Sequence, residues 1–436
     1  MENNQLVADY KKNRGLILLI AVAGMTAYLL PYLRSYYYDD MIQFFGITDL
    51  QMGTLGSVYG AFAIIGYCLG GWVADRFPLK YIVPGSLIVT GLLGYINMLR
   101  PSYGVLLFIN GAWGITTILT FWNPLMKALR FLSKPEEQGR GYALFDIGRG
   151  VLNFVFGVAV VAGFAAVVTK VGNIGGVNIL FAFYSSWTVV VGVVVYFLIR
   201  KIPDIRPKNK EKDKAFAKNL LDVIKMPTTW CLIIAMFANY GVIVSFFYLV
   251  PYCTAVFGLS AAVASILGYC GQAFRIAGCA IGGNLADRKG LSNMYIVDMA
   301  LMALGYLAII LLPEGFRAVG VLIILIGIIA MSQYAAQALH YAVMEEGDYP
   351  VEKMGAATFI ITPLGYAGES IFPLFNGWCL SHWSDSTTAY NFMFGGYVVV
   401  LVIGIIAVLI FQRFTKERRA MLAEQRKARL AKAKAE

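Results

Sequence analysis

Long apolar segments alternate with short polar ones along almost the whole chain. Many of the apolar segments reach the length of about 20 residues that a helix needs to cross about 30 Å of hydrocarbon. Open strands are excluded there, because their backbone amides would have no partner in lipid. The pattern therefore predicts an all-α membrane protein with twelve transmembrane helices, near residues 15–38, 51–74, 80–99, 103–128, 139–166, 177–200, 228–256, 260–286, 291–313, 315–343, 354–378 and 388–412.

A charged segment near the middle of the chain divides these helices into two sets of six. It covers residues 201–227, and we interpret it as a cytoplasmic linker between bundles at 15–200 and 228–412. A cytoplasmic N-terminus at 1–14 and a basic cytoplasmic tail at 413–436 complete the expected organisation. The N-terminal segment enters the first apolar run without a small-residue cleavage site, so we expect this helix to be retained.

Composition agrees with a membrane location. The 436 residues are 59% hydrophobic and only 14% charged, and the mean hydropathy is +0.67. The net charge of +11 resides in short segments between apolar runs and in the tail, which holds nine Lys and Arg residues. Basic residues of this kind mark cytoplasmic loops and lie close to anionic lipid. We expect both termini in the cytoplasm and no nucleic-acid role, because no aromatic or motif support accompanies the charge.

Neither the cysteines nor the histidines form a pattern that indicates catalysis. The six cysteines lie mostly in apolar runs without metal-like spacing, and the chain has two histidines. No nucleotide-binding loop and no Ser-His-Asp grouping stands out. We expect no metal, no cofactor and no enzymatic activity.

One motif occurs at corresponding places in the two halves. GGWVADRFPLK covers residues 70–80 after the second predicted span, and GGNLADRKGLS covers 282–292 after the eighth. Glycine lets neighbouring helices approach closely, and an Asp with an Arg can tie a helix end to the adjoining loop. We expect a conformational role for Gly71, Asp75, Arg76, Gly283, Asp287 and Arg288.

This repeated G-G-x-x-A-D-R pattern resembles the signature of the major facilitator superfamily. The resemblance covers residues from about 15 to 412, and Pro78 stands where the family usually has a Gly that the second copy keeps as Gly290. It implies the major facilitator fold, two pseudo-symmetric six-helix bundles that give alternating access to a central site. It also implies that spans one, four, seven and ten line the substrate cavity.

Charged residues within the predicted spans are costly, about 2.5–3.5 kcal/mol each on insertion scales, and indicate function. Cations outnumber acids by four to two in this set. The surplus favours an anionic substrate with a carboxylate, sulfonate or phosphate group, which Arg can bind with two hydrogen bonds. The set comprises Arg34, Lys127, Arg149, Arg275, Asp146 and Glu369.

Several of these residues have a structural alternative. Asp146 and Arg149 are three residues apart on one helix and can neutralise each other, and Lys127 can extend to the cytoplasm. Glu369 can carry a coupling proton, or it can form a gating ion pair with a cation of the other half. His340, another residue considered for coupling or gating, can equally be a packed, hydrogen-bonded side chain.

Polar and aromatic residues on the four cavity-lining spans are further candidates for substrate binding, with helix packing as the alternative. Their ring faces and polar edges suit a sugar-like body. They are Tyr32, Tyr36, Trp113, Trp122, Asn123, Asn239, Tyr240, Tyr248, Gln333, Tyr334 and Gln337.

The region around Arg34 is similar to the organophosphate and organic-anion branch of the superfamily. The phosphate carriers of that branch use a second Arg where this chain has Asn239, and a Lys near Tyr67 is also missing. Arg275 resembles the arrangement of oxalate-type carboxylate exchangers, and two longer segments resemble bacterial permeases that accompany sugar-acid or sulfosugar use. We therefore expect a monomeric carrier of a small organic anion in a bacterial inner membrane, driven by protons or by a counter-anion.

Two other functions remain open at this point. The aromatic spans would also suit proton-driven efflux of amphiphilic compounds. A transport-like sensor that binds a ligand and signals to a partner is the third possibility, although the chain has no recognisable signalling domain.

Overall fold

A computed structural model describes residues 9–134, 138–200, 212–312 and 319–435, and the described part contains helices and no strands. Parts of the predicted N-terminal segment and linker, residues 1–8 and 201–211, lie outside the described residues. The helices fall into two compact units. The first comprises residues 1–208, 247–273 and 373–382, and the second comprises 209–246, 274–372 and 383–436.

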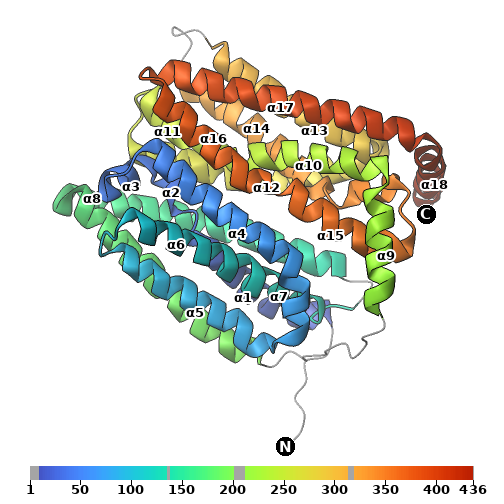
Figure 1. The fold of residues 1–436 in the computed structure, drawn as a ribbon, viewed down its shortest axis with the longest axis horizontal. Helices are drawn as coiled ribbons and strands as arrows, with labels where there is room; N and C mark the ends of the chain where they lie inside the picture. Colours follow the sequence, from blue (N-terminus) through green and yellow to red (C-terminus); the bar gives the residue numbers. More distant parts are fainter. Residues whose placement is uncertain (1–8, 135–137, 201–211, 313–318, 436) are drawn as a thin grey trace, which may run out of the picture. The chain divides into compact units, whose positions relative to one another are not determined.

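The first unit contains the helices of the N-terminal half (Figure 1). Segments from α11, α12 and α16 belong to it as well. The helix bounds are α1 Tyr10–Leu29, α2 Leu33–Tyr36, α3 Tyr38–Phe45, α4 Asp49–Arg76, α5 Leu79–Asn97, α6 Tyr103–Gly114, the π-helix η1 Ile115–Trp122, α7 Asn123–Arg130, α8 Gln138–Ile199, α11 Leu249–Ala255, α12 Ala261–Lys289 and α16 Gly368–His382.

The second unit contains the remaining helices, together with the later part of α12 and the start of α16. In Figure 1, α9 runs across the ends of α10 and α15, which it contacts. The bounds are α9 Lys212–Ile224, α10 Pro227–Ser245, α13 Leu291–Ile310, α14 Val319–Leu339, the 3-10 turns η5 Ala342–Gly347 and η6 Val351–Lys353, α15 Met354–Gly365, α17 Ser386–Phe414 and α18 Lys416–Ala435. A further 3-10 turn, η3 Phe246–Tyr248, spans the position in the sequence where one unit ends and the other resumes.

Eight of the described helices are long and apolar enough to cross a membrane. One of them, α8, contains the two spans predicted at 139–166 and 177–200, separated at Gly172, whose φ of 74° interrupts the helix. That backbone conformation favours glycine, because it has no Cβ. The span predicted at 354–378 is divided into the short helices α15 and α16.

Each unit has an interior packed with apolar side chains, and many large apolar side chains also remain exposed. In the first unit, Phe121, Leu125 and Phe145 are almost completely buried. On α8 and α17, by contrast, Val155, Val190 and Val399 are more than half exposed. In a water-soluble protein such surfaces would be a liability, whereas lipid covers them in a bilayer. The all-α membrane fold predicted from the sequence is confirmed.

The C-terminal part of the predicted linker packs as an amphipathic helix on the second unit. Lys353 Nζ lies 2.8 Å from Asp222 Oδ2, and the hydrogen bond and charge of Lys353 lower the pKa of Asp222. Asn219 Nδ2 donates to the carbonyl oxygen of Glu352 at 3.1 Å. The rings of Phe216 and Phe359 meet edge to face. These contacts attach α9 to the η6–α15 segment.

Candidate functional site

Arg34 is the second residue of the short helix α2 and lies among aromatic rings of the first unit. Its Nη1 donates a hydrogen bond to the carbonyl oxygen of Pro31. Its guanidinium carbon lies 5.5 Å from the ring centre of Tyr32 and 5.7 Å from that of Tyr59. Among the described residues, no carboxylate forms an ion pair with Arg34. A half-buried guanidinium is thus surrounded by ring faces and has donors left for an anion.

A row of rings links Arg34 to a second arginine. Tyr28 contacts Tyr32 at a centroid distance of 6.1 Å and Trp122 at 5.8 Å. Arg149 lies over Trp122, with its guanidinium carbon 5.0 Å from the ring centre. Because these rings lie on α1, η1 and the Tyr32 turn, predicted spans one and four together make an aromatic surface with an arginine at each end.

The other two cations of the first unit that the sequence singled out have acidic partners. Arg149 Nη2 donates to Asp146 Oδ1 at 3.1 Å, which realises the local pair considered from the sequence. Lys127 Nζ lies 2.8 Å from Asp75 Oδ1 and donates to the carbonyl oxygen of Ala74 at 2.9 Å. Lys127 is therefore part of the first motif's hydrogen-bond network, and Arg34 differs from both cations.

Residues on either side of the π-helix η1 hold the predicted fourth span against its neighbours. Trp113 is buried and its Nε1 donates to the carbonyl oxygen of Thr90 at 3.1 Å. Asn123 Nδ2 donates to the carbonyl oxygens of Gly66 and Ile118. A wider π turn rotates the residues after it relative to an α-helix, and such turns often occur at functional sites. Trp113 and Asn123 nevertheless use these polar groups for helix packing.

A second set of contacts in the first unit involves the α11, α12 and α16 segments. The rings of Tyr36 and Tyr269 stack at 3.7 Å with an interplanar angle of 2°. Ser265 Oγ donates to the carbonyl oxygen of Tyr36, and Tyr248 OH donates to that of Pro373 at 3.4 Å. Two of the predicted substrate residues, Tyr36 and Tyr248, thus belong to this contact layer.

Two acids of α3 extend this layer. Asp39 Oδ2 accepts a 2.7 Å hydrogen bond from Thr254 Oγ1, and Asp40 Oδ1 accepts one of 2.6 Å from Asn173 Nδ2. Burial, followed by the neighbouring charge of Asp39, raises the pKa of Asp40 to about 6. This end of the first unit therefore contains a carboxyl whose pKa lies above its usual range.

In the second unit, Arg275 lies over the ring of Tyr334, with its guanidinium carbon 5.0 Å from the ring centre. Tyr240 stacks on Tyr366 at 4.1 Å. Glu369 belongs to the first turn of α16 and is only 3% exposed. Gln337, three residues after Tyr334 on α14, is half-buried.

His340 is buried and has a buried polar partner. Its Nε2 is 2.7 Å from Asn239 Oδ1, and Gln333, about two turns earlier on α14, is completely buried. Asp298 of α13, which sequence reasoning missed, is 4% exposed. Asp298 was missed because it lies only two turns from the start of the span predicted at 291–313, where charged residues often mark the end of a helix. The signal that could have identified it is that no basic residue lies near it in the sequence to form an ion pair.

The glycines of the repeated motif make matching contacts in the two halves. A Cβ on Gly70 would lie 1.9 Å from Asn123 Nδ2, and one on Gly282 would lie 2.5 Å from Ala335 Cβ. Gly71 and Gly283, by contrast, have no such atom within 4 Å. The close helix approach thus involves the first glycine of each pair. Arg76 lies over the ring of Trp72 and Arg288 is exposed, while the side chain of Asp287 lies outside the described residues.

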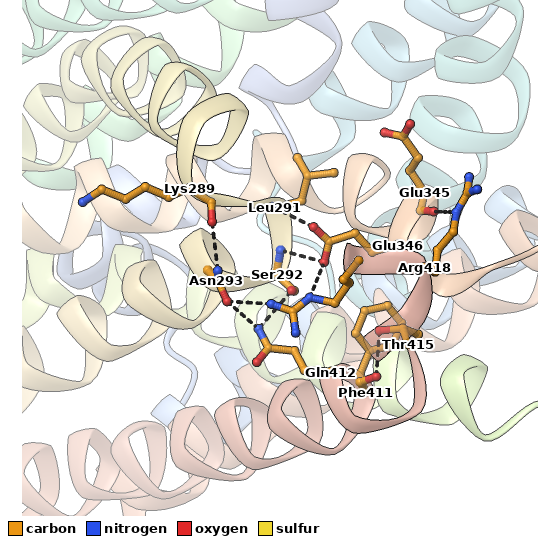
Figure 2. Close-up of polar contacts among 11 residues, drawn as sticks. Lys289, Leu291, Ser292, Asn293, Glu345, Glu346, Phe411, Gln412, Thr415 and Arg418 are labelled. Carbon is orange, nitrogen blue, oxygen red and sulfur yellow. Dashed lines mark hydrogen bonds and ion pairs between the residues drawn. The ribbon is translucent and has the colours of Figure 1, made fainter. Parts of the chain in front are cut away.

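Beside the second copy, a buried acid joins three segments (Figure 2). Glu346 accepts hydrogen bonds from the backbone N–H groups of Leu291 at 2.9 Å and Ser292 at 3.3 Å. Arg419 Nε lies 3.3 Å from its Oε2, and Arg419 Nη2 donates to Asn293 Oδ1. Sequence reasoning missed this network, because neither the acids after span ten nor the tail arginines indicated a buried pairing.

The sequence pattern of the Major Facilitator Superfamily matches residues 15–373. Two Escherichia coli K12 proteins are similar along nearly their whole length. Inner membrane protein YihN is 27% identical over 95% of this chain and 99% of its own, and inner membrane protein YqcE is 27% identical over 92% and 95%.

Solved structures show the same fold. A bacterial homologue of the human lysosomal transporter Spinster superposes with a TM-score of 0.73 at 17% identity, covering 94% of this chain and 99% of that one. The nucleoside transporter NupG, in a mutant form, gives a TM-score of 0.71 at 11% identity, covering 92% and 100%. With the family pattern matching most of the chain, the protein belongs to the Major Facilitator Superfamily and is a secondary transporter.

Proposed function

We propose that this transporter carries a small organic anion, such as a sugar acid, a sulfonate or another carboxylate, across a bacterial inner membrane. Transport is by alternating access and is coupled to protons or to exchange for a counter-anion. The observation that carries the proposal is the set of partners around the Arg34 side chain. Its partners among the described residues are a carbonyl oxygen and two rings, and no acid among them neutralises it.

The cost of burying such a charge supports an anionic ligand. An arginine within a span is expensive unless it meets a counter-charge or polar partners. Arg149 and Lys127 have their counter-charges in Asp146 and Asp75. Arg34 keeps its positive charge without one in the described part of the chain, which is the arrangement that a substrate carboxylate or sulfonate would complete with two parallel hydrogen bonds.

The rings beside Arg34 support a substrate with a flat or sugar-like body. Tyr28, Tyr32 and Trp122 form a continuous aromatic surface between Arg34 and Arg149. Sugar rings and planar groups pack on such faces while their hydroxyls reach phenol and indole edges. An anion head on Arg34 with its body along this surface is the binding mode that we favour.

The test is uptake into proteoliposomes of four labelled anions: glucuronate, isethionate, oxalate and glucose 6-phosphate. Saturable uptake of at least one is expected in the wild type. Arg34→Ala should weaken its affinity about 10- to 150-fold, the equivalent of one charged hydrogen bond of about 1.5–3 kcal/mol. Arg34→Lys should recover part of the loss, because Lys keeps the charge without the planar fork.

Arg100 provides a matched control. It also donates to a carbonyl oxygen, that of Phe44, and lies over the Phe44 ring, but in the loop after α5. Arg100→Ala should leave uptake unchanged. Equal uptake by wild type and Arg34→Ala would overturn the anion site. Drug sensitivity without anion uptake would favour efflux of amphiphilic compounds, and binding without flux would favour a sensor.

A further inference from the structure

Three helices of the second unit enclose a group of buried polar side chains. Tyr295 near the start of α13 meets the His340 ring at 5.8 Å, and a Cβ on Gly305 would lie 2.5 Å from Ile329 Cγ1 of α14. These two contacts fix an antiparallel register. It places Met302 of α13 level with Gln333 of α14, because each step along one helix is matched by a step back along the other.

The third helix, α10, meets the same face of α13. Tyr295 OH donates to the carbonyl oxygen of Ala235 at 3.4 Å, and Asn239 Nδ2 lies 3.5 Å from Met302 Sδ. Asp298 is three residues after Tyr295 and four before Met302, so the helical period places it on the face that these two residues share. Asp298, Asn239, Gln333 and His340 therefore lie around one interface of α10, α13 and α14.

This group has more polar atoms than hydrogen bonds. The four side chains are 4%, 0%, 0% and 2% exposed, in the order Asp298, Asn239, Gln333 and His340. Within the part of the chain that the structure describes, Asp298 Oδ2, His340 Nδ1 and both amide atoms of Gln333 have no hydrogen-bond partner. Buried polar atoms are rarely left so, and a group of them is the setting in which internal water is held.

The hydrogen bonds of Asn239 fix the role of the imidazole. Its amide nitrogen is directed to Met302 Sδ, so its oxygen accepts from His340 Nε2. With the ring proton on Nε2, His340 Nδ1 is an acceptor, and it has no donor among the described residues. A protonated Asp298 would supply a donor to this group, either directly or through water.

Asp298 also has no counter-charge in the described part of the chain. None of the ion pairs there involves it. Most titratable groups on the elements packed against α13 are phenols. The full set is Tyr295 and Tyr306 of α13 itself, Cys231 and Tyr240 of α10, Tyr334 of α14, Tyr390, Tyr397 and Arg413 of α17, Glu345 and Glu346 of η5, and His340. Glu346 pairs with Arg419 at the start of α13. An ionised carboxylate in such a position is costly, because neither bulk water nor a counter-charge stabilises it.

We propose that Asp298 binds and releases the proton that drives transport, with His340, Asn239 and Gln333 as the buried polar group that receives and returns it. The inference rests on the proposed function, since it assigns the proton-coupled alternative to a residue. It differs from the sequence-based hypothesis, in which Glu369 carries the proton. In this proposal Asp298 acts through the protonation state of the second unit and not through contact with the substrate.

The first experiment needs no substrate. Infrared spectra of the purified full-length protein at pH 7 should contain a carboxylic-acid C=O stretching component that disappears in Asp298→Asn and persists in Glu369→Gln. The matched control is Tyr306→Phe, which removes a buried hydroxyl two turns further along α13. That hydroxyl also has no hydrogen-bond partner among the described residues. A wild-type spectrum identical to that of Asp298→Asn would mean an ionised Asp298 and would overturn the proposal.

The second experiment separates coupling from binding, using the anion of the four above that the wild type transports best. Asp298→Asn should lose accumulation driven by a pH gradient by at least about tenfold, while exchange of labelled for unlabelled anion at equal pH is retained. Proton-driven accumulation at wild-type level would overturn the proposal. So would loss of exchange in a variant with wild-type thermal stability, because Asp298 would then act in binding.

A failure of the proposed substrate class and a failure of the proposed role of Asp298 give different results. If the wild type takes up none of the four anions, the proposed substrate class fails and the infrared result still decides whether Asp298 holds a proton. If the wild type takes up an anion with no response to a pH gradient, anion exchange replaces proton coupling, and the role of Asp298 is overturned while the anion site stands.

Discussion

The two copies of the repeated motif lie beside ion pairs that differ in exposure. The acid of the pair beside the first copy is exposed to solvent, whereas the acid of the pair beside the second copy is buried. Asp75, whose side chain is 51% exposed, pairs with Lys127 within the first unit. In the second unit the buried partner is Glu346, 3% exposed at its side chain, which holds Arg419 and the first two N–H groups of α13. The two copies of the motif thus lie beside ion pairs that differ in their exposure to solvent.

The helices that follow the two copies begin in different ways, which explains this contrast. Pro78 precedes α5 with a φ of −63°, the value to which its ring restricts it. Gly290 precedes α13 with a φ of 107°, which side chains rarely adopt. The glycine turn lets the N-terminus of α13 face Glu346, and a helix N-terminus attracts a carboxylate. The departure at Pro78 therefore changes the local geometry, not only the sequence.

The largest expected effect is the loss of the buried acid. Glu346→Ala removes the acceptor of two backbone N–H groups and the counter-charge of Arg419, which keeps its hydrogen bond to Asn293. The free energy of unfolding should therefore fall by about 3–5 kcal/mol. Thermal unfolding of the purified protein in detergent measures it. The control is Glu345→Ala, since the neighbouring side chain is exposed and only the Glu345 backbone oxygen bonds to Arg418. Equal stability of both variants would mean that the buried contacts of Glu346 do not stabilise the protein, and would contradict the difference described between the two copies.

The fold was predictable because its signal is long and repeated. Twelve apolar stretches and a duplicated motif were enough to predict an all-α bundle of the major facilitator type, and the family match confirms it. The break at Gly172 lies between two predicted spans, as glycine in a polar gap suggests. Hydropathy did not reveal the π turn at Ile115–Trp122, because the residues there are as apolar as those of an α-helix.

The site was less predictable, since partners depend on which helices meet. The residue types at Arg34, Arg149 and Lys127 indicated charge in the spans, but only the packing distinguishes a cation with an acid from one without. Asp146 was within reach of sequence reasoning, being three residues from Arg149. Asp75 was not, because it lies 52 residues from Lys127 and meets it through the packing of α4 on α7.

A smaller effect distinguishes the two glycines of each copy. Gly282→Ala places a methyl group against Ala335, whose Cα would lie 3.0 Å away, and should cost about 1–3 kcal/mol of stability. Gly283→Ala meets no atom and should stabilise the helix by about 0.4–1 kcal/mol. The measurement is thermal unfolding of both variants, and a larger loss at Gly283 would contradict the packing described.

The first copy sharpens this glycine comparison. The atom that a Cβ on Gly70 would meet is the side-chain amide of Asn123, which can turn away but then gives up its hydrogen bonds to Gly66 and Ile118. Gly70→Ala should therefore destabilise less than Gly282→Ala, and Gly71→Ala should again be neutral or stabilising. A side chain can move where the backbone beside Ala335 cannot.

The smallest effect is expected at the exposed pair of the first copy. A double-mutant cycle of Asp75→Ala and Lys127→Ala should give a coupling energy below about 1 kcal/mol, because solvent screens Asp75 and both side chains lose freedom when they pair. The same cycle with Glu346→Ala and Arg419→Ala should give a larger value, since Glu346 is shielded from water. Raising the salt concentration tests the cause: it should reduce the first coupling markedly and the second little. Two couplings of equal size and equal salt dependence would mean that burial does not separate the two copies.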